Sequence, residues 1–448
     1  MSTRPYPSYK DSGAQWLAEI PSTWGLGRIK DSVELAKNGV WGDEPDGSGD
    51  DIWCVRVADF DRVSFRVNPS SKTTRKVLAN ERVHRVLNRG DLLLEKSGGG
   101  EKTPVGSVVL YDFVEPAVCS NFIGRVSLSP GMVPKYWAFL HAAAHAVGLT
   151  QRSIKQTSGI QNLDQAAYFD EVAPFPPLDE QRQIADYLDV QTAKIDALVG
   201  KQEQLIETLA ERRQAVISHA VTKGLDPNAP MKDSGVEWAD IVPKTWTVTR
   251  LKRRWDVIDC NHVTAEFVAE GYPLASIREC QSKWVNLQTA KRTTKKYYQK
   301  MAEGPRKPRY RDLIFTRNAT VGSVAQVPAN IEAFAMGQDV CLLRSRDSKQ
   351  SPDFYQYMLR SSVVASQIES LLIGSTFKRI NIEQIRQFVV AAPGASEQLE
   401  IVAFLDAGTA KIDALSAKAR EMIDVLKERR QALISAAVTG KIDVRGLV

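Results

Sequence analysis

Few residues in this 448-residue chain have the types and spacing that catalysis requires. His141 and His145 stand four residues apart, so on a helix they would share one face and could hold a metal. No acidic residue lies between them and no third ligand is apparent, which favours a structural role. The segment Gly98–Thr103 hints at a phosphate loop built on Lys102 and Thr103, but it lacks both glycines that such a loop requires. The sequence contains neither GxGxxG nor GxSxG, and we expect a chain that binds and positions without catalysing.

One segment is suited to binding a polyanion. Lys291–Arg311 holds nine Lys or Arg in 21 residues, interleaved with three tyrosines. Lys and Arg neutralise phosphates, and hydroxyl groups add oriented donors. The wider region 227–390 holds 25 basic and 16 acidic residues, a balance of +9, whereas residues 1–175 hold 20 of each. The excess is local, as expected of a nucleic-acid interface, although a solvated basic face remains the alternative.

Further candidate contacts lie in loops at the ends of expected strands. Arg suits guanine, and Asn or Gln suits adenine. The predicted DNA-contacting residues are Lys72, Thr73, Thr74, Arg75, Lys96, Ser97, Gln161, Asn162, Lys291, Arg292, Lys295, Lys296, Tyr297, Arg317, Asn318, Lys378 and Arg379.

Composition excludes several classes of protein. Hydrophobic residues make up 43% and charged residues 25%, as in a folded globular chain. No apolar stretch is long enough to span a membrane, and the first residues, MSTRPYPSYKDSG, have no apolar core for a secretory signal. Five scattered cysteines without a CxxC pair favour reduced thiols in the cytoplasm over disulfides or a zinc site.

The elements that would position these loops form an internal duplication. Residues 179–226 (DEQRQIADYLDVQTAKIDALVGKQEQLIETLAERRQAVISHAVTKGLD) match residues 396–443 (SEQLEIVAFLDAGTAKIDALSAKAREMIDVLKERRQALISAAVTGKID) without a gap, with 26 identities in 48 positions. Residues 10–31 match 232–253, with Trp16/Trp238, Pro21/Pro243 and Trp24/Trp246 in register. The chain is therefore two copies of one unit, each with a tryptophan-containing arm, a variable body and a matched helix.

The matched segments predict two long helices, each about 65 Å at 1.5 Å per residue, with Asp179 and Ser396 as N-caps. Apolar residues at coiled-coil spacing form an expected seam that would pack the helices together. Its members are Ile195, Leu198, Leu205, Leu209 and Val216 in the first copy, and Ile412, Leu415, Met422, Leu426 and Leu433 in the second.

The bodies diverge but keep parallels that indicate one mixed frame. GDLLLEKSG (90–98) corresponds to RDLIFTRNA (311–319), and Gly159–Asn162 to Thr376–Arg379. Residues 107–111, 340–343 and 388–391 read as strands, and 134–146 and 352–372 as helices. The expected fold class is α+β: two similar domains separated by two long α-helices packed as an antiparallel coiled coil. The expected boundaries are 1–178, 179–225, 226–395 and 396–448.

The duplicated helices and arms resemble those of the specificity subunits of type I restriction-modification systems. FPPLDEQRQIADYLDVQTAKIDAL with ERRQAVISHAVTKGLD, their distal copies, and the arms GAQWLAEIPSTW and GVEWADIVPKTW carry the resemblance, which covers the frame of the whole chain. The distal copy departs at Ala392–Ala395, where the first has FPPL, which puts the turn that leads into that helix in doubt.

The resemblance implies that the two domains each read half of a split DNA site. Because the two bodies diverge in sequence, we expect the halves to differ and the site to be asymmetric. The resemblance also implies that the helices bind two methyltransferase subunits and, where present, two restriction subunits. No cofactor is expected on this chain: S-adenosylmethionine would bind the methyltransferase, and ATP and Mg would bind the restriction subunit. Two other classes stay open, a fused enzyme and a scaffold that assembles proteins without reading DNA; a DNA-binding titration with the partner subunits would separate the scaffold from the reader.

Overall fold

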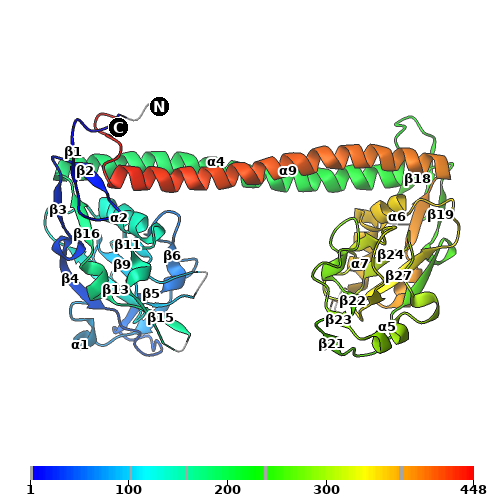
Figure 1. Ribbon diagram of the computed structural model, residues 1–448, viewed down its shortest axis with the longest axis horizontal. Coiled ribbons are helices and arrows are strands. Elements are labelled where there is room, and N and C mark those ends of the chain that lie inside the picture. Colours follow the sequence, from blue (N-terminus) through cyan, green and yellow to red (C-terminus); the bar gives the residue numbers. More distant parts are fainter. Residues whose placement is uncertain (1–3, 101–102, 158, 237–239, 373–377, 448) are drawn as a thin grey trace. The chain divides into compact units, whose positions relative to one another are not determined.

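The computed structural model describes residues 4–100, 103–157, 159–236, 240–372 and 378–447, and these form two compact units. Unit 1 contains residues up to Gln202 together with those from Glu421, and unit 2 contains Glu203–Arg420. Each unit combines a mixed body of strands and short helices with part of both long helices, so the expected α+β class is confirmed (Figure 1). The boundary between the units thus falls within both long helices. The boundaries expected from sequence instead assign each long helix to a segment of its own. Trp238 and Lys102 lie outside the described residues.

The body of unit 1 is built on a six-stranded sheet and smaller sheets. The large sheet has the order β4 (Val33–Asn38), β13 (Ile123–Leu128), β9 (Leu92–Glu95), β11 (Val108–Leu110), β7 (Arg66–Val67) and β6 (Phe60–Asp61). Two three-stranded sheets have the orders β12 (Ala117–Cys119), β5 (Asp51–Val55), β8 (Thr74–Lys76) and β10 (Ser97–Gly98), β15 (Ile160–Leu163), β14 (Ile154–Thr157). Two pairs are β1 (Tyr9–Asp11) with β2 (Glu19–Pro21) and β3 (Gly25–Arg28) with β16 (Val172–Phe175), and the short helices are α1 (Ala79–Arg82), α2 (Pro134–Ala146) and α3 (Gln165–Phe169).

Unit 2 repeats the arm and much of this frame. Its four-stranded sheets have the orders β20 (Trp255–Asp259), β27 (Val340–Ser345), β24 (Leu313–Thr316), β25 (Val324–Gln326) and β21 (Phe267–Val268), β23 (Arg292–Thr293), β22 (Tyr272–Ala275), β26 (Ala335–Met336). The pairs are β17 (Met231–Asp233) with β18 (Ile241–Pro243) and β19 (Thr247–Arg250) with β28 (Val389–Ala392), and the short helices are α5 (Lys295–Met301), α6 (Pro352–Leu359), α7 (Ser362–Leu372) and α8 (Ile382–Arg386). The helix expected over 352–372 is interrupted at Arg360–Ser361.

The long helices are α4 (Leu178–Lys223) and α9 (Ala395–Val438), as the repeat predicts. Both begin one residue before the expected caps, so Asp179 and Ser396 lie inside the first turn and the N-cap prediction is wrong. The two helices start in the same way despite the different sequences before them. Gln181 donates to the carbonyl of Pro176 at 3.0 Å, and Gln398 donates to that of Pro393 at 3.0 Å.

The tryptophan arms fix the first turns of α4 and α9 by the same hydrogen bond in both units. The indole of Trp24 donates to Glu180 Oε2 at 2.8 Å, and the indole of Trp246 donates to Glu397 Oε1 at 2.9 Å. Both rings are fully buried. A buried indole usually finds a partner for its N–H, and here the first-turn glutamate supplies it. The arms are therefore matched in sequence because each one packs against the start of a long helix.

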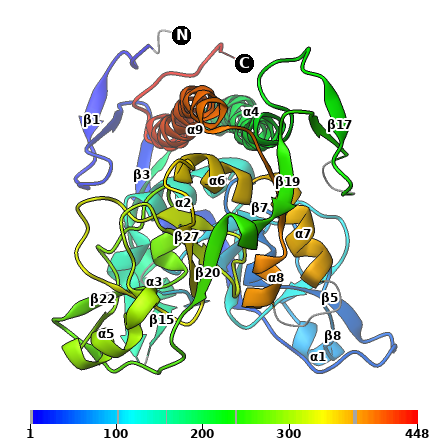
Figure 2. The same cartoon turned by 90° about the vertical axis from the view of Figure 1, so that its right-hand side faces the viewer.

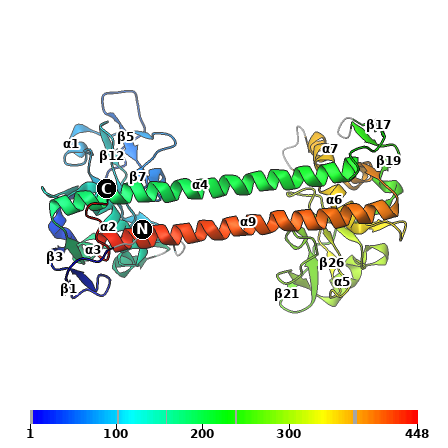
Figure 3. The same cartoon turned by 90° about the horizontal axis from the view of Figure 1, so that it is seen from above.

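In each unit the two helices lie side by side and antiparallel (Figures 1 and 3). In unit 1 the first part of α4 meets the last part of α9, where Asp196 accepts from Arg430 at 2.8 Å. In unit 2 the order is reversed, and Arg213 donates to Asp413 at 3.0 Å. Antiparallel packing is confirmed.

The seam between the helices differs from the expected one at four positions. Ile195, Leu209, Ile412 and Leu426 are buried, and Val216 and Leu433 are partly buried, as predicted. The remaining four predicted members are exposed, by 43% to 52%: Leu198, Leu205, Leu415 and Met422. The seam instead passes through Leu188, Thr192, Ile195, Val199, Gln202, Ile206, Leu209, Arg213, Val216 and Ala220 of α4, and through Leu405, Thr409, Ile412, Ser416, Ala419, Ile423, Leu426, Arg430, Leu433 and Ala437 of α9. These positions keep a strict alternation of four and three residues, and polar side chains occupy several of them.

Within the described residues, no helix is long and apolar enough to cross a membrane.

Candidate nucleic-acid interface

In unit 1 two predicted segments meet at the end of strand β9. Ser97 of β10 pairs with Asn162 of β15 in antiparallel register, and the Ser97 hydroxyl donates to Asn162 Oδ1. The preceding residue, Lys96, donates from Nζ to Asn38 Oδ1 at the end of strand β4. β15 lies at the end of unit 1 away from α4 and α9 (Figure 1). Residues that are distant in sequence thus form one polar surface.

Unit 2 builds the same arrangement with different residues. Asn318 follows strand β24 and forms an antiparallel bridge with Arg379. The N–H of Ala319 donates to the carbonyl of Lys378 at 2.8 Å, and the N–H of Ile380 donates to that of Arg317 at 3.0 Å. The pair Ser97–Asn162 in unit 1 therefore corresponds to Asn318–Arg379 in unit 2. One backbone frame presents two different sets of side chains.

A cationic residue precedes each of these pairs, and its depth below the surface differs between the two units. Lys96 is half-buried, and this burial lowers its pKa. Its counterpart Arg317 is only 2% exposed and forms an ion pair with Asp259 Oδ1 at 3.2 Å. Arg317 also donates to the carbonyl of Gln338 at 3.2 Å. A guanidinium bound in this way supports the loop from inside.

Three predicted DNA contacts are therefore corrected. Arg75 is 8% exposed, and its guanidinium binds Glu44 and the carbonyls of Trp41 and Gly42. Gln161 is 7% exposed, and its Oε1 accepts from the N–H of Val105. These two side chains and Arg317 already have partners inside the body, as most buried polar side chains of folded proteins do. The sequence alone does not show whether an arginine side chain points into the body or toward the solvent.

The other predicted residues keep their polar groups at or near the surface. The exposed ones are Lys72, Thr74, Asn162, Lys291, Lys295, Lys296, Lys378 and Arg379, and the half-buried ones are Thr73, Lys96, Ser97, Arg292, Tyr297 and Asn318. Some of them are already paired: Lys72 with Glu115, Arg292 with Glu332, and Asn318 with Asp339. Their contact with DNA stays a prediction.

The basic segment of unit 2 forms helix α5 and the strand before it. Thr294 caps the helix by accepting from the N–H of Tyr297 at 3.5 Å, which leaves Lys295 and Lys296 exposed on the first turn. Tyr298 stacks on Tyr272 with ring centroids 4.1 Å apart and planes at 7°. α5 lies at the end of unit 2 away from the long helices (Figures 1 and 2). It therefore lies at the same end of its unit as the polar surface of unit 1 does.

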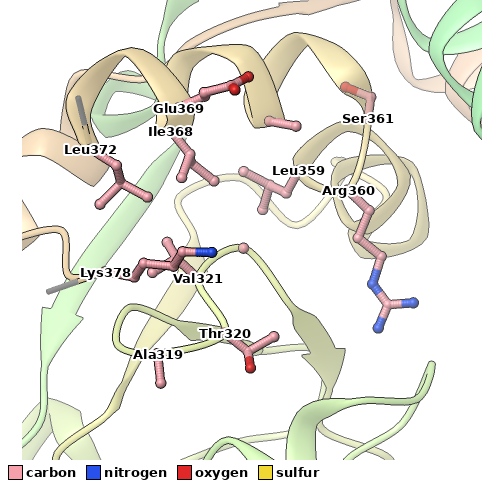
Figure 4. A pocket seen from close by; sticks show the side chains of 12 residues that line it. Ala319, Thr320, Val321, Leu359, Arg360, Ser361, Ile368, Glu369, Leu372 and Lys378 are labelled. Atoms are coloured by element: carbon pink, nitrogen blue, oxygen red, sulfur yellow. The ribbon is translucent and has the colours of Figure 1, made fainter. Parts of the chain in front are cut away.

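Lys378 also lines a cavity of about 610 Å³ between the 319–322 loop and helix α7. Figure 4 shows its side chain extended beside Val321, with Ile368 across from it. The exposed Lys378 side chain thus adjoins apolar surface of unit 2.

Among the residues that it describes, the structure brings together one group with metal-ligating potential that the sequence analysis missed. Ligand atoms of Asp259, Cys260 and His262 lie within 4.8 Å of one another. Arg317 Nη2 approaches all three, at 3.2 Å from Asp259 Oδ1, 3.6 Å from Cys260 Sγ and 3.5 Å from His262 Nε2. Burial raises the pKa of Cys260, which disfavours the thiolate that a metal needs. The guanidinium of Arg317 lies where a metal ion would bind, so we interpret the group as an ion-pair cluster.

We expect Arg317→Met to destabilise the protein by about 2–4 kcal/mol, because it leaves Asp259 without its cation inside the loop frame. Arg346→Met is the matched control, since Arg346 and Asp256 form an ion pair whose side chains are each about half exposed. That variant should cost no more than about 1 kcal/mol. Thermal unfolding of both variants measures the difference, and equal shifts would contradict the assignment of Arg317 as a supporting residue.

The histidine pair of helix α2 has partners within its own body. His141 Nδ1 lies 2.7 Å from the Tyr168 hydroxyl, and His145 Nδ1 lies 2.7 Å from Thr150 Oγ1. Burial lowers the pKa of His141 to about 4. A neutral, hydrogen-bonded imidazole in the core agrees with the structural role favoured from sequence.

Comparisons with known proteins agree on one family. Residues 249–423 match the family model described as the type I restriction modification DNA specificity domain. The chain is 22% identical over 438 residues to the putative MjaX specificity subunit of a type I restriction enzyme from Methanocaldococcus jannaschii, covering 96% of both chains. It is 22% identical over 339 residues to the EcoBI specificity subunit of Escherichia coli, covering 73% of this chain and 70% of that one.

The fold has a solved counterpart. A chain from a study of complex assembly and conformational transition in the type I restriction-modification system aligns with a TM-score of 0.71 and 18% identity. The alignment covers 96% of this chain and 99% of that chain. At this identity the likeness concerns the fold.

Proposed function

Because the chain belongs to the type I restriction-modification specificity subunits, we propose that its two units each read one half of a split, asymmetric DNA sequence. The chain itself would catalyse no step. The observation that carries the proposal is the repeated strand-end frame. Ser97–Asn162 and Asn318–Arg379 occupy equivalent backbone positions but offer different hydrogen-bonding groups. To read two different half-sites, the two units must present different hydrogen-bonding side chains at equivalent positions.

The helices would hold the partners. The four predicted seam residues that lie exposed on the long helices, Leu198, Leu205, Leu415 and Met422, are suited to a protein contact. We assign them to two methyltransferase subunits, which would carry S-adenosylmethionine. Restriction subunits, with ATP and Mg, would join the same complex. If instead the complex binds DNA without sequence preference, the chain is an assembly scaffold.

The DNA-facing role of α5 gives a direct test. Lys295→Ala combined with Lys296→Ala should weaken DNA binding by the assembled complex and reduce the slope of log affinity against log salt by about 1 for each phosphate that is no longer neutralised. Lys244→Ala combined with Lys349→Ala, two exposed lysines of the same unit, is the control for charge. An unchanged slope for the first pair, or equal changes for both pairs, would remove α5 from the interface.

A further inference from the structure

Unit 1 contains an apolar pocket that directly adjoins its candidate DNA surface. The pocket has a volume of about 390 Å³, and Trp41, Arg56, Asn121 and Phe122 are among its lining residues. Trp41 and Phe122 are 38% and 47% exposed although both line the pocket. The aromatic rings therefore face a space that nothing within the described part of the chain fills.

Backbone hydrogen bonds connect the pocket directly to the candidate DNA surface. The carbonyl of Phe122 accepts from the N–H of Lys96 at 2.8 Å and from the N–H of Ser97 at 3.2 Å. Asn38, which binds the Lys96 ammonium, lies three residues before Trp41. A nucleic acid that meets Lys96 and Ser97 also meets the mouth of this pocket.

The pocket is held in shape before any ligand arrives. The guanidinium of Arg75 lies 4.6 Å from the Trp41 ring centroid, and Glu44 and two backbone carbonyls fix Arg75 in turn. Among the other lining residues, Arg56 binds the buried carboxylate of Asp59 through Nη2 at 3.1 Å. A fixed aromatic wall loses little entropy on binding a flat ligand.

Unit 2 has a different surface at the equivalent place. The N–H of Arg317 donates to the carbonyl of Asp339 at 2.9 Å, as Lys96 does to Phe122, so Asp339 corresponds to Phe122. Asp259 is the counterpart of Asn38, and His262 lies three residues beyond it, as Trp41 does in unit 1. Arg317 contacts His262, and Asn318 binds Asp339 at 2.6 Å. One unit thus has an apolar aromatic pocket where the other has a polar, internally paired cluster.

We propose that the pocket of unit 1 receives the methyl group and ring edge of one thymine in the half-site that this unit reads. The inference rests on the proposed function and names a residue-level determinant of it. Of the four bases, thymine alone presents a methyl group in the major groove, and apolar side chains recognise that group. The cationic Lys96 and Arg56 beside the pocket match the charge of the DNA backbone. The exposed amide of Asn121 can bind the neighbouring base edge.

The test uses the chain assembled with its methyltransferase partner and DNA that contains the recognised site. Each thymine is replaced in turn by deoxyuridine, which lacks only the methyl group. At one thymine of the half-site that unit 1 reads, this replacement should weaken binding about fourfold, the effect expected for the loss of one buried methyl group. Finding no such thymine, or no thymine in that half-site, would overturn the proposal.

Variants of the chain then connect the thymine to the pocket. Trp41→Ala and Phe122→Ala should bind thymine and uracil equally at that position. Val114→Ala, which truncates an apolar side chain that is 86% exposed elsewhere in unit 1, and His262→Ala in unit 2 should keep the discrimination. Discrimination that survives both pocket variants would contradict the assignment. Since the uracil scan uses the unaltered protein, it stands even if a variant folds poorly. Absence of all sequence preference in the unaltered complex would instead contradict the proposed function.

Discussion

Replacing Leu209 by aspartate should lower the free energy of unfolding by about 3–5 kcal/mol, whereas the same replacement at Leu205 should change it by less than about 0.5 kcal/mol. Leu209 is 6% exposed in the seam, and Leu205, one turn earlier on α4, is 43% exposed. An aspartate at the first position buries an unpaired charge between the helices. At the second position it remains in water.

Urea unfolding of the two variants measures this difference in unit 2. Leu426→Asp and Met422→Asp repeat the comparison in unit 1, since Leu426 is 7% exposed and Met422 is 49% exposed. Equal destabilisation within either pair would contradict the observed seam. If the exposed positions bind methyltransferase subunits, Leu205→Asp and Met422→Asp should weaken assembly while leaving stability unchanged.

Inserting seven residues into both long helices should change the recognised DNA sequence. The insertions follow Gln202 and Arg420, the points where the chain passes from one unit to the other in each helix. Seven residues preserve the heptad pattern and add about 10 Å of helix, or about three base pairs of B-form DNA. If helix length sets the distance between half-sites, both halves of the sequence stay and the gap between them grows by about three base pairs.

The length of this gap is measured by mapping the methylated sites in cells that express the altered chain. An insertion in one helix alone is the control, because it leaves the partner helix too short and should abolish modification at both the old and the new site. An unchanged gap with both insertions present would mean that helix length does not set the spacing.

The long-range frame was predictable because the chain repeats itself. The matched segments predicted both long helices to within a few residues, and Trp24 and Trp246 marked the arms that pack against the two helix starts. The seam was misassigned because Leu198, Leu205 and Met422 each stand directly before an apolar seam residue, namely Val199, Ile206 and Ile423, so two neighbouring registers both look apolar in the sequence. Hydrophobicity does not decide between the two registers, and the polar seam residues Gln202 and Arg213 make the correct one look interrupted.

The candidate surface was predictable only in part. The parallel between Lys96–Ser97 and Arg317–Asn318 was visible in sequence and is the same strand end in both units. Whether a side chain points inward depends on partners elsewhere in the chain, as Asp259 shows for Arg317. The pocket was missed because Trp41 and Phe122 are 81 positions apart and meet only through strand pairing.

The central claim is that this chain selects the DNA sequence that a methyltransferase modifies. The most direct test maps modified bases in host DNA with the gene present and with the gene deleted, while any neighbouring methyltransferase gene stays intact. We predict the loss of one split, gapped methyladenine sequence on deletion and its return when the gene is restored. Persistence of that sequence in the deletion strain would contradict the claim.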